Sequence, residues 1–524
     1  MKDRFLNLPV FYRGAKIVGN ESTEISAVNF GLRKGDEYYR IRFQVFTSSP
    51  DIKPEVIALR FKEDSDSTVW IDFVSRNEEG LKLKISDSCA TRDNPAIRLC
   101  WSDQNLTLEL YDQGVSYNLM RDRGPLSSEL NHTKGQPFTL KELVGRARIR
   151  NYKSAEEAIS VFQAKEKISE ARGNLLPHLN MRDVVSVVTE GPLGLISSVG
   201  DLLPFIFPTS WNDWSKSREL YQAEILSFAA LLANEMNTVE GFYYVIHRDQ
   251  AMLLFLDQQI NKLETIQASI KKLEDRGALQ PGSTTDFKLS IRSIQQDRRQ
   301  LASLIEKELA ALAEAVALSP VYQKIDIASI QLPDLLTVNR SPSAHEFVET
   351  AKARSLELGT LYFMQEAAGV ETGQKQFGFL DPNSGEFFGA GYSSSIRIAG
   401  AEIEKLKIRT LAMETGLERK SVEVAADLSE AIDIYRRANE GATDVERRLD
   451  QVVWKPLERG AISLNDSKIL LQVIELFRKS IEFEASRLSS AHAYLIAESK
   501  LNRLLLNGFY EGLEVVSLPK GPSR

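Results

Sequence analysis

Residues 213–276 read DWSKSRELYQAEILSFAALLANEMNTVEGFYYVIHRDQAMLLFLDQQINKLETIQASIKKLEDR. The stretch contains a single glycine and no proline, so nothing in it stops a helix. At 1.5 Å rise per residue, about 64 residues make a helix of about 96 Å, longer than any ordinary globular core needs. Residues 398–459 predict a second rod, with Gly400, Gly416 and Gly441 as its weak points. The chain is therefore expected to contain two very long helices.

Each rod is followed by apolar residues at near-heptad spacing, the pattern of a helix that packs along a partner helix. These residues are Phe287, Ile291, Ile294, Leu301, Ile305, Leu312 and Val316 after the first rod, and Leu470, Ile474, Phe477, Ile481, Leu488 and Leu495 after the second. The spacing indicates paired helices, and an isolated antiparallel coiled coil would show the same pattern.

Residues 1–140 instead alternate apolar and polar side chains, as at residues 41–45, 81–85 and 106–110. About eight or nine such runs, separated by turn clusters, predict an antiparallel β-sandwich or jelly roll. Its aromatic residues Trp70, Trp101 and Tyr111 either fill the sandwich core, the favoured interpretation, or form a face that binds a carbohydrate or protein ligand. Cys89 and Cys100 either form a disulfide or remain buried free thiols, and the two options are equally weighted.

The composition argues against several classes of protein. The 524 residues are enough for two or three domains, and 65 Lys+Arg against 72 Asp+Glu, without a strongly basic block, argue against nucleic acid as a partner. No run of 18 apolar residues predicts a transmembrane helix. The start, residues 1–5, is not followed by the apolar core of a secretory signal, which leaves open a mature form, a form with its signal removed, or a cytoplasmic protein.

The two helical blocks share an order of parts, which indicates an internal duplication. The shared parts are a short helix beginning Ser-Ala (Ser154, Ser343), a segment rich in Gly, Pro and aromatic residues (177–212, 360–396), the rod, an Arg-Gly-Ala turn (276–278, 459–461) and an aspartate leading into the next helix (Asp286, Asp466). At each turn the glycine allows the chain to reverse, and the neighbouring Ser, Thr or Asp is expected to cap the following helix.

About residues 150–515 resemble the outer membrane efflux protein family, TolC and its relatives. Residues 158–179, ending in Leu-Pro before Leu179, look like the family's first helix running into its first membrane strand. Residues 460–466 match the family's spacing of Gly, five residues and Asp at a periplasmic helix hairpin, and the counterpart 277–286 is three residues longer. The resemblance implies a duplicated protomer of strands and long helices that forms a trimeric channel-tunnel.

The expected fold is thus mainly α with an added all-β domain. The expected divisions are 1–140 (β-sandwich), 150–330 (first TolC-like repeat), 340–515 (second TolC-like repeat) and 516–524 (disordered tail). Within each repeat the Gly- and aromatic-rich segment is expected to form short membrane strands, with residues 376–379 pairing with a strand that includes Phe388, Tyr392 and Ile396. Residues 191–211 are apolar but contain prolines, so they form either a membrane-contacting tongue or a loop buried against the rods.

The resemblance also implies roles for single residues. The hairpin tips would dock a periplasmic adaptor and an inner-membrane transporter through Gly277, Thr285, Asp286, Gly460, Ser463 and Asp466. Contact with the membrane would involve Phe388, Tyr392, Ile396, Phe205, Phe207 and Trp211. Asp444 and Arg447, just before the second tip, would supply constricting charge at an aperture.

No enzymatic chemistry is predicted. The five histidines are scattered without metal-ligand spacing, and the sequence contains no nucleotide-binding glycine loop, nucleophile elbow or zinc-protease helix. No cofactor or metal is therefore expected.

The leading hypothesis is an outer-membrane channel-tunnel component of an efflux or type I secretion system, a homotrimeric passive conduit opened by helix rearrangement. One alternative is a TolC-like helical scaffold that is not a channel and has a ligand-binding N-terminal domain. Another is an α-helical pore-forming toxin with a hydrophobic tongue at 191–211. The expected location is the outer membrane or periplasm, while the chain start leaves a cytoplasmic or soluble location open.

Overall fold

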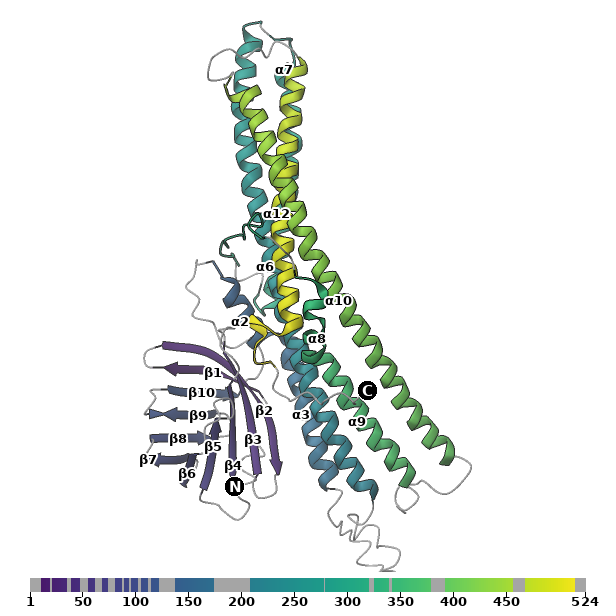
Figure 1. Ribbon diagram of the computed structural model, residues 1–524. Helices are drawn as coiled ribbons and strands as arrows, with labels where there is room; N and C mark the ends of the chain where they lie inside the picture. The colour runs from purple at the N-terminus through teal and green to yellow at the C-terminus, as the bar shows by residue number, and fades with distance from the viewer. Residues whose placement is uncertain are drawn as a thin grey trace, which may run out of the picture.

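The computed structural model describes residues 11–18, 21–34, 39–47, 55–61, 68–73, 81–86, 89–93, 96–101, 105–111, 115–121, 137–173, 208–277, 279–319, 325–338, 342–377, 392–455 and 467–513. The molecule is elongated, with long helices that rise to a hairpin tip and a β domain beside their lower part (Figure 1). The predicted second turn at residues 456–466 and the predicted tail 516–524 lie outside the described residues.

The N-terminal domain is an antiparallel closed barrel of ten strands, in which each strand pairs with its sequence neighbours and β1 also pairs with β10. The strands are β1 Phe11–Val18, β2 Glu21–Lys34, β3 Tyr39–Thr47, β4 Glu55–Phe61, β5 Thr68–Phe73, β6 Leu81–Ser86, β7 Cys89–Asp93, β8 Ala96–Trp101, β9 Asn105–Leu110 and β10 Val115–Arg121. The predicted all-β character is correct, but the sandwich is not. Closure depends on pairing between the first and last strands, which alternation along each strand does not encode.

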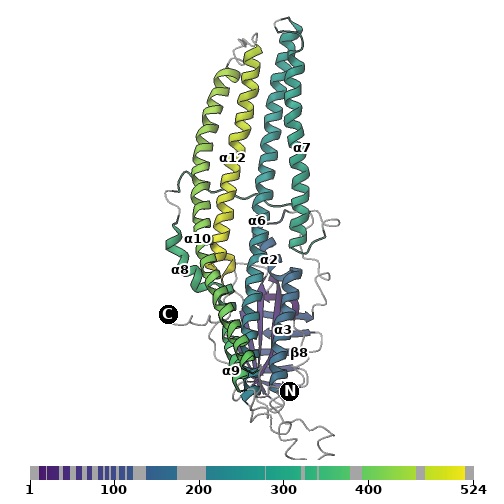
Figure 2. The same cartoon turned by 90° about the vertical axis from the view of Figure 1, so that its right-hand side faces the viewer.

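The described residues that follow the barrel are mainly helical. The helices are α2 Leu140–Arg150, α3 Tyr152–Gly173, α6 Pro208–Asp275, α7 Ser283–Ala315, α8 Ala344–Arg354, α9 Leu356–Phe377, α10 Tyr392–Leu449, continued by the π-turn Asp450–Trp454, α12 Ser467–Leu505 and the 3₁₀ turn Gly508–Tyr510. Both predicted rods are present as α6 and α10. Figure 2 shows two long hairpins, α6–α7 and α10–α12, side by side.

The internal duplication is visible in the helix order. An 11-residue helix, a single-residue break and a 22-residue helix precede each rod, as α2 and α3 in the first half and α8 and α9 in the second. Ser343 is the N-cap of α8, as its Ser-Ala signal predicts, but its structural counterpart is Thr139 and not Ser154. Ser154 lies inside the first turn of α3, because Asn151 starts that helix one turn earlier.

The predicted strand pair in the second repeat is wrong wherever the structure describes it. Gln376 and Phe377 end helix α9, and Tyr392–Ile396 open helix α10. Alternation over a few residues with many serines fits a helical turn as well as a strand, so the packing of the neighbouring helix decides the outcome. Residues 378–391 and the counterpart segment 174–207 lie outside the described residues.

Helix α6 is the centre of the helical part. It contacts α3 and α9 along its first half, α7 along its second half, and α12 between the two repeats. Its apolar residues therefore lie on several faces, and Phe228, Leu232, Met236 and Tyr243 are buried in one cluster with residues of α2, α3 and α7. Among the described helices, none has the length and continuous apolar character that crossing a bilayer requires.

Candidate functional site

The first hairpin tip turns through two glycines in the left-handed conformation. Gly277 has φ of 72° just after α6, and Gly282 has φ of 99° at the start of α7, values that side chains with a Cβ rarely adopt. Thr285 and Asp286, two of the predicted docking residues, lie exposed in the first turn of α7. They are therefore accessible at the end of the molecule.

The N-terminus of α7 is capped from the preceding helix and not by its own Ser, Thr or Asp, contrary to expectation. The Glu274 carboxylate accepts hydrogen bonds from the amides of Gly282 (2.6 Å) and Thr284 (2.9 Å). The Thr284 hydroxyl and these two amides lower the pKa of Glu274. A carboxylate at a helix N-terminus also opposes the positive end of the helix dipole, so Glu274 fixes the tip.

The second tip cannot be compared, because Gly460, Ser463 and Asp466 lie outside the described residues. Asp444 and Arg447, the predicted aperture charges, form an ion pair of 3.1 Å one turn apart on α10. Both side chains are more than half exposed, so the pair itself adds little stability. Their charges remain available to a facing surface.

The stalk below the tips contains one apolar core shared by both hairpins. Residues of α6, α7, α10 and α12 pack in the same cluster, including Phe287, Ile291, Leu449, Val473 and Phe477. Most of the residues predicted from heptad spacing in α7 and α12 thus lie in a core, this one or the cluster around α2 and α3. A change in packing between the hairpins would repack this shared core.

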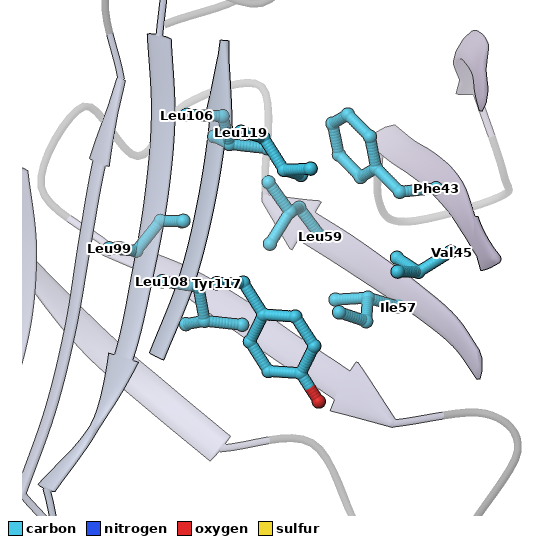
Figure 3. Close-up of a pocket in the computed structure, with 9 residues that line it drawn as sticks. All are labelled: Phe43, Val45, Ile57, Leu59, Leu99, Leu106, Leu108, Tyr117 and Leu119. Carbon is cyan, nitrogen blue, oxygen red and sulfur yellow. The ribbon is translucent and has the colours of Figure 1, made fainter. Parts of the chain in front are cut away.

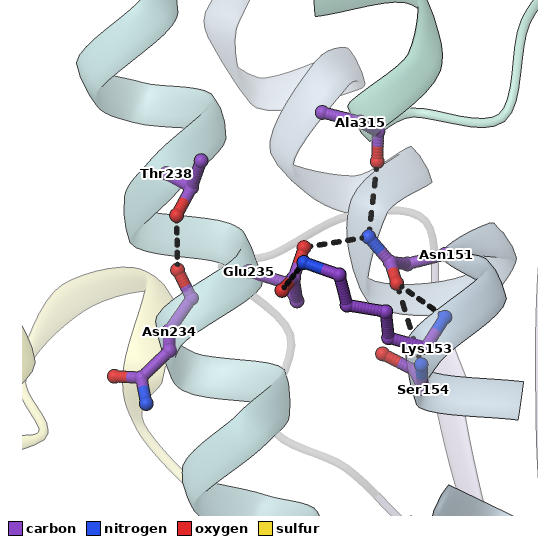
Figure 4. Close-up of polar contacts among 7 residues, drawn as sticks. All are labelled: Asn151, Lys153, Ser154, Asn234, Glu235, Thr238 and Ala315. Atoms are coloured by element: carbon purple, nitrogen blue, oxygen red, sulfur yellow. Dashed lines mark hydrogen bonds and ion pairs between the residues drawn. The ribbon is translucent and has the colours of Figure 1, made fainter. Parts of the chain in front are cut away.

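The helix pair α2–α3 meets the first hairpin at a polar joint centred on Asn151 (Figure 4). The Asn151 amide nitrogen donates to the Glu235 carboxylate (2.9 Å) and to the Ala315 carbonyl (3.1 Å), which ends α7. Its side-chain oxygen accepts from the amides of Lys153 (2.8 Å) and Ser154 (3.3 Å), and so caps α3. One residue therefore joins α3, α6 and α7.

Two further contacts fix the segment between the barrel and this joint. Arg146 donates from Nε to the Val316 carbonyl at 2.8 Å, which satisfies the free end of α7. Phe138 forms a parallel bridge with Ile327, with the Phe138 amide donating to the Asp326 carbonyl at 2.7 Å. The segment 138–150 is thus bonded to the end of α7 and to the residues that follow it.

A histidine pair connects the two repeats. The Ile330 amide donates to Nε2 of His247 at 3.1 Å, Nδ1 of His247 lies 2.9 Å from Nε2 of His492, and Nδ1 of His492 lies 2.7 Å from the Leu488 carbonyl. Both rings can form this series of hydrogen bonds only when they are neutral and carry their hydrogen on Nδ1. Burial lowers the pKa of both, that of His492 to about 4. No sequence spacing signals this contact.

A buried charged contact lies nearby between α6, α9 and α12. Arg503 forms an ion pair with Glu357 and donates from Nε to the Asn234 side-chain oxygen at 2.9 Å. Burial alone would raise the pKa of Glu357, but the charge of Arg503 outweighs it and the pKa is lowered. Arg503 therefore ties the second repeat to the central helix α6.

Helix α10 has an apolar seam on the face turned away from its partners. Ala401, Ile408, Thr415 and Val422 follow one another at intervals of seven residues and are all exposed, with Leu411 beside them. The exposed fractions of Ile408 and Val422 are 66% and 59%, although both are large apolar side chains. Heptad spacing on an unpaired face is the signal of a further helix partner.

The barrel interior is a packed core and not a ligand pocket. Its cavity is about 20 Å³, room for about one water molecule, and its lining includes Phe43, Leu99 and Tyr117 (Figure 3). Trp101 is buried there, whereas Trp70 points outward and Tyr111 is 56% exposed. The favoured interpretation of the aromatic residues as core thus applies only to Trp101. Cys89 and Cys100, opposite each other on β7 and β8, form a disulfide.

Of the predicted membrane-contact residues, Phe205, Phe207 and Phe388 lie outside the described residues. Tyr392 and Ile396 are in α10, and Trp211 is in α6 with about half of its surface exposed. The Trp211 ring meets the Trp214 ring edge-on at 6.2 Å, and Arg218 lies over the Trp214 ring. In the part of the chain that the structure describes, no group of His, Cys, Asp or Glu could hold a metal ion.

Comparison with solved structures identifies the fold of the helical part. A membrane protein from Pseudomonas aeruginosa aligns with a TM-score of 0.59 and 15% identity, covering 72% of this chain and 92% of that one. The outer membrane protein VceC from Vibrio cholerae gives 0.56 and 13%, covering 71% and 96%. The CmeC outer membrane channel from Campylobacter jejuni gives 0.55 and 11%, covering 70% and 85%.

No protein-family model matches the sequence, and no curated protein matches it either. The structural matches nevertheless confirm the TolC-like resemblance at the level of the fold. They span most of each solved channel, while more than a quarter of this chain stays unmatched, about the share that precedes α2.

Proposed function

We propose that this chain is the protomer of a homotrimeric outer-membrane channel-tunnel, a passive conduit of an efflux or type I secretion system. The observation that carries the proposal is the α10 seam of Ala401, Ile408, Thr415 and Val422, an exposed and mainly apolar row at heptad spacing on a rod whose other face is already buried. A second copy of the chain is the proposed occupant, because rods that pack side by side in a ring leave such a seam on each protomer.

In this channel the hairpin tips and the opposite end of the helical part have different roles. The tips at Gly277, Thr285 and Asp286 dock a periplasmic adaptor and an inner-membrane transporter, and Asp444 with Arg447 supplies charge near the aperture. The opposite end, with Trp211 and Ile396, contacts the membrane, since Trp side chains favour the headgroup region. Opening is a shift between two packings of the stalk helices, and no catalytic step is involved.

The trimer is tested by placing like charges in the seam. The double change Ile408→Glu and Val422→Glu should convert the detergent-extracted trimer to monomer, measured by mass photometry, because a charge buried in an apolar helix seam loses its hydration without gaining a partner. The control Ile408→Thr with Val422→Thr is polar but uncharged and should retain some trimer. A wild-type protein that is monomeric at all concentrations, or a Glu variant that stays trimeric, contradicts the proposal.

A second candidate is a helical scaffold with the same fold that does not conduct solutes. The observation in its favour is helix at Gln376–Phe377 and Tyr392–Ile396, where membrane strands were expected. Cell fractionation separates the two: a channel remains with outer membranes after a carbonate wash, and a scaffold is recovered without detergent. The toxin hypothesis rests on residues 191–211, of which only 208–211 are described, and it stays a prediction.

A further inference from the structure

The outer surface of the N-terminal barrel has a row of basic side chains beside a tryptophan. Antiparallel pairing places Trp70 opposite Lys82, Lys84 opposite Thr91, and Thr91 opposite Arg98. The residues between them, such as Leu83 and Leu99, are buried inside the barrel, so this set points outward. Lys82, Lys84 and Arg98 are all exposed, and we call Trp70 with these three cations the basic face.

The spacing of the cations follows from the sheet. Lys84 and Arg98 lie two strands apart, about 10 Å, and Lys82 lies about 7 Å from Lys84 along β6. The Lys82 ammonium also lies 5.6 Å from the centre of the Trp70 ring. Glu109 is opposite Arg98 on β9 and forms the acidic border of the face. Three cationic side chains thus project from neighbouring positions of the sheet beside an aromatic ring.

The basic face is rigid and lies on the free side of the barrel. The Cys89–Cys100 disulfide joins β7 and β8 one outward pair away from Thr91 and Arg98. Helix α3 contacts β1 and β2, and α2 contacts β3, whereas β6–β9 lie on the side away from the helices (Figure 1). Neither the channel seam on α10 nor the hairpin tip involves this surface.

We propose that the basic face binds an acidic polysaccharide, with Lys82, Lys84 and Arg98 pairing with its carboxylate or phosphate groups and Trp70 packing against a sugar ring. Ammonium and guanidinium groups form charge-assisted hydrogen bonds with such anions. The indole ring offers a flat apolar surface to the C–H face of a pyranose. This binding is independent of the proposed channel function.

Other ligand classes fit this surface less well. The barrel cavity of about 20 Å³ excludes a small molecule bound inside it. A long row of nucleic-acid phosphates would need a longer basic track than these three cations, because binding strength depends on the number of phosphates neutralised. A bilayer surface would need exposed apolar side chains that insert, but Trp70, the large apolar residue of the face, is only partly exposed. An extended sugar chain matches a flat, rigid, locally charged sheet.

The test uses the full-length protein and immobilised polysaccharides. Polygalacturonate supplies carboxylates, a phosphomannan supplies phosphates, and dextran is the uncharged reference. The protein should bind at least one acidic polymer and not dextran, with an affinity that falls as salt rises from about 50 mM to about 300 mM, because exposed charges are screened. Thermal unfolding of every variant verifies that the barrel remains folded.

Variants then locate the binding site. The triple change Lys82→Ala, Lys84→Ala and Arg98→Ala should weaken binding about ten-fold or more, and Trp70→Ala about three-fold. Glu109→Gln should strengthen it, because a neighbouring negative charge is removed. The control removes the same charge from exposed residues of α10, with Lys405→Ala, Lys407→Ala and Arg409→Ala, and should leave binding unchanged.

Several outcomes overturn the proposal. Absence of binding to both acidic polymers does so, as does equal loss in the barrel triple variant and the α10 control. Binding of phosphatidylglycerol vesicles through the basic face without binding of either polymer would assign the surface to a lipid instead. A wild-type protein that is monomeric at all concentrations but binds an acidic polymer would contradict the channel proposal and leave this one standing.

Discussion

His247 on α6 and His492 on α12, separated by 245 residues in sequence, share a hydrogen bond of 2.9 Å between Nδ1 and Nε2. The Ile330 amide donates at one end of this series of hydrogen bonds and the Leu488 carbonyl accepts at the other. Each ring must therefore donate through one nitrogen and accept through the other, so both rings are neutral. The charged groups closest by are Arg248, which opposes protonation of His492, and Asp249, which favours it weakly. The contact therefore joins the repeats as long as neither ring takes up a proton.

This pair predicts a loss of stability in mild acid. The pKa of His492 is lowered in the folded protein to about 4, whereas the unfolded chain binds the proton near 6.5. Stability is thus fully present above pH 6.5 and falls as the pH approaches 4, by about 3 kcal/mol at most. Urea unfolding at several pH values should show that His492→Gln removes most of this slope.

The exposed His345 provides the control for that experiment. His345→Gln should keep the wild-type dependence of unfolding free energy on pH, because its side chain is exposed at the start of α8. Buried carboxylates such as Glu240, whose pKa is raised by burial, act in the opposite direction, so the comparison must be between variants. An unchanged slope in His492→Gln would show that the pair is not neutral in the folded protein.

The long helices were predictable because their signals are local. Absence of helix-breaking residues over residues 213–276, together with heptad spacing at Phe287 and Phe477, requires no knowledge of the rest of the chain. The glycine turn at Gly277 was predictable for the same reason. These signals were sufficient to recognise the duplicated hairpin fold.

The contacts that were missed are those between distant parts of the chain. The barrel closes because β1 pairs with β10. The alternation of apolar and polar residues along a strand is the same in a barrel and in a sandwich, so it does not predict this pairing. The caps were also non-local: Glu274 reaches back from α6 to α7, and Asn151 joins three helices. At Tyr392–Ile396 a short alternating run was overridden by the helix it extends.

The polar joint predicts unequal effects for two neighbouring residues. Asn151→Ala removes the cap of α3 and leaves the buried oxygen of Glu235 and the Ala315 carbonyl without this donor. We expect a loss of about 2–3 kcal/mol in unfolding free energy. Lys153→Ala removes only the ion pair of an exposed ammonium with the same Glu235, and should cost less than about 1 kcal/mol. Chemical denaturation of both variants measures the difference, and equal losses would contradict the central role of Asn151.

The tip predicts a local effect of Glu274. Glu274→Ala should speed amide hydrogen exchange at Gly282 and Thr284 by about ten-fold or more, because both amides lose their acceptor. The neighbouring Asp275→Ala is the control, since Asp275 is exposed and should leave those amides protected. Because the pKa of Glu274 is lowered in the folded state, its capping is complete above pH 4.5 and weakens only below that. Exchange that is equally fast in wild type would disprove the cap.

Two glycines of α10 predict changes of opposite sign. A Cβ at Gly416 would meet nothing within 4 Å, so Gly416→Ala should stabilise the protein by about 0.5–1 kcal/mol through helix propensity. A Cβ at Gly441 would lie 2.4 Å from the Phe483 ring of α12, which must move. We expect Gly441→Ala to lower the unfolding free energy by about 1–3 kcal/mol.

A double variant tests whether the Phe483 ring causes the loss of unfolding free energy in Gly441→Ala. In Gly441→Ala combined with Phe483→Leu the smaller side chain makes room for the methyl group, so the double variant should lose less than the sum of the two single variants. Thermal unfolding of the four proteins gives the interaction energy directly. Additive losses, or a stabilising Gly441→Ala, would mean that α10 and α12 are not packed closely at this level of the stalk, and the shared core of the two hairpins would have to be revised.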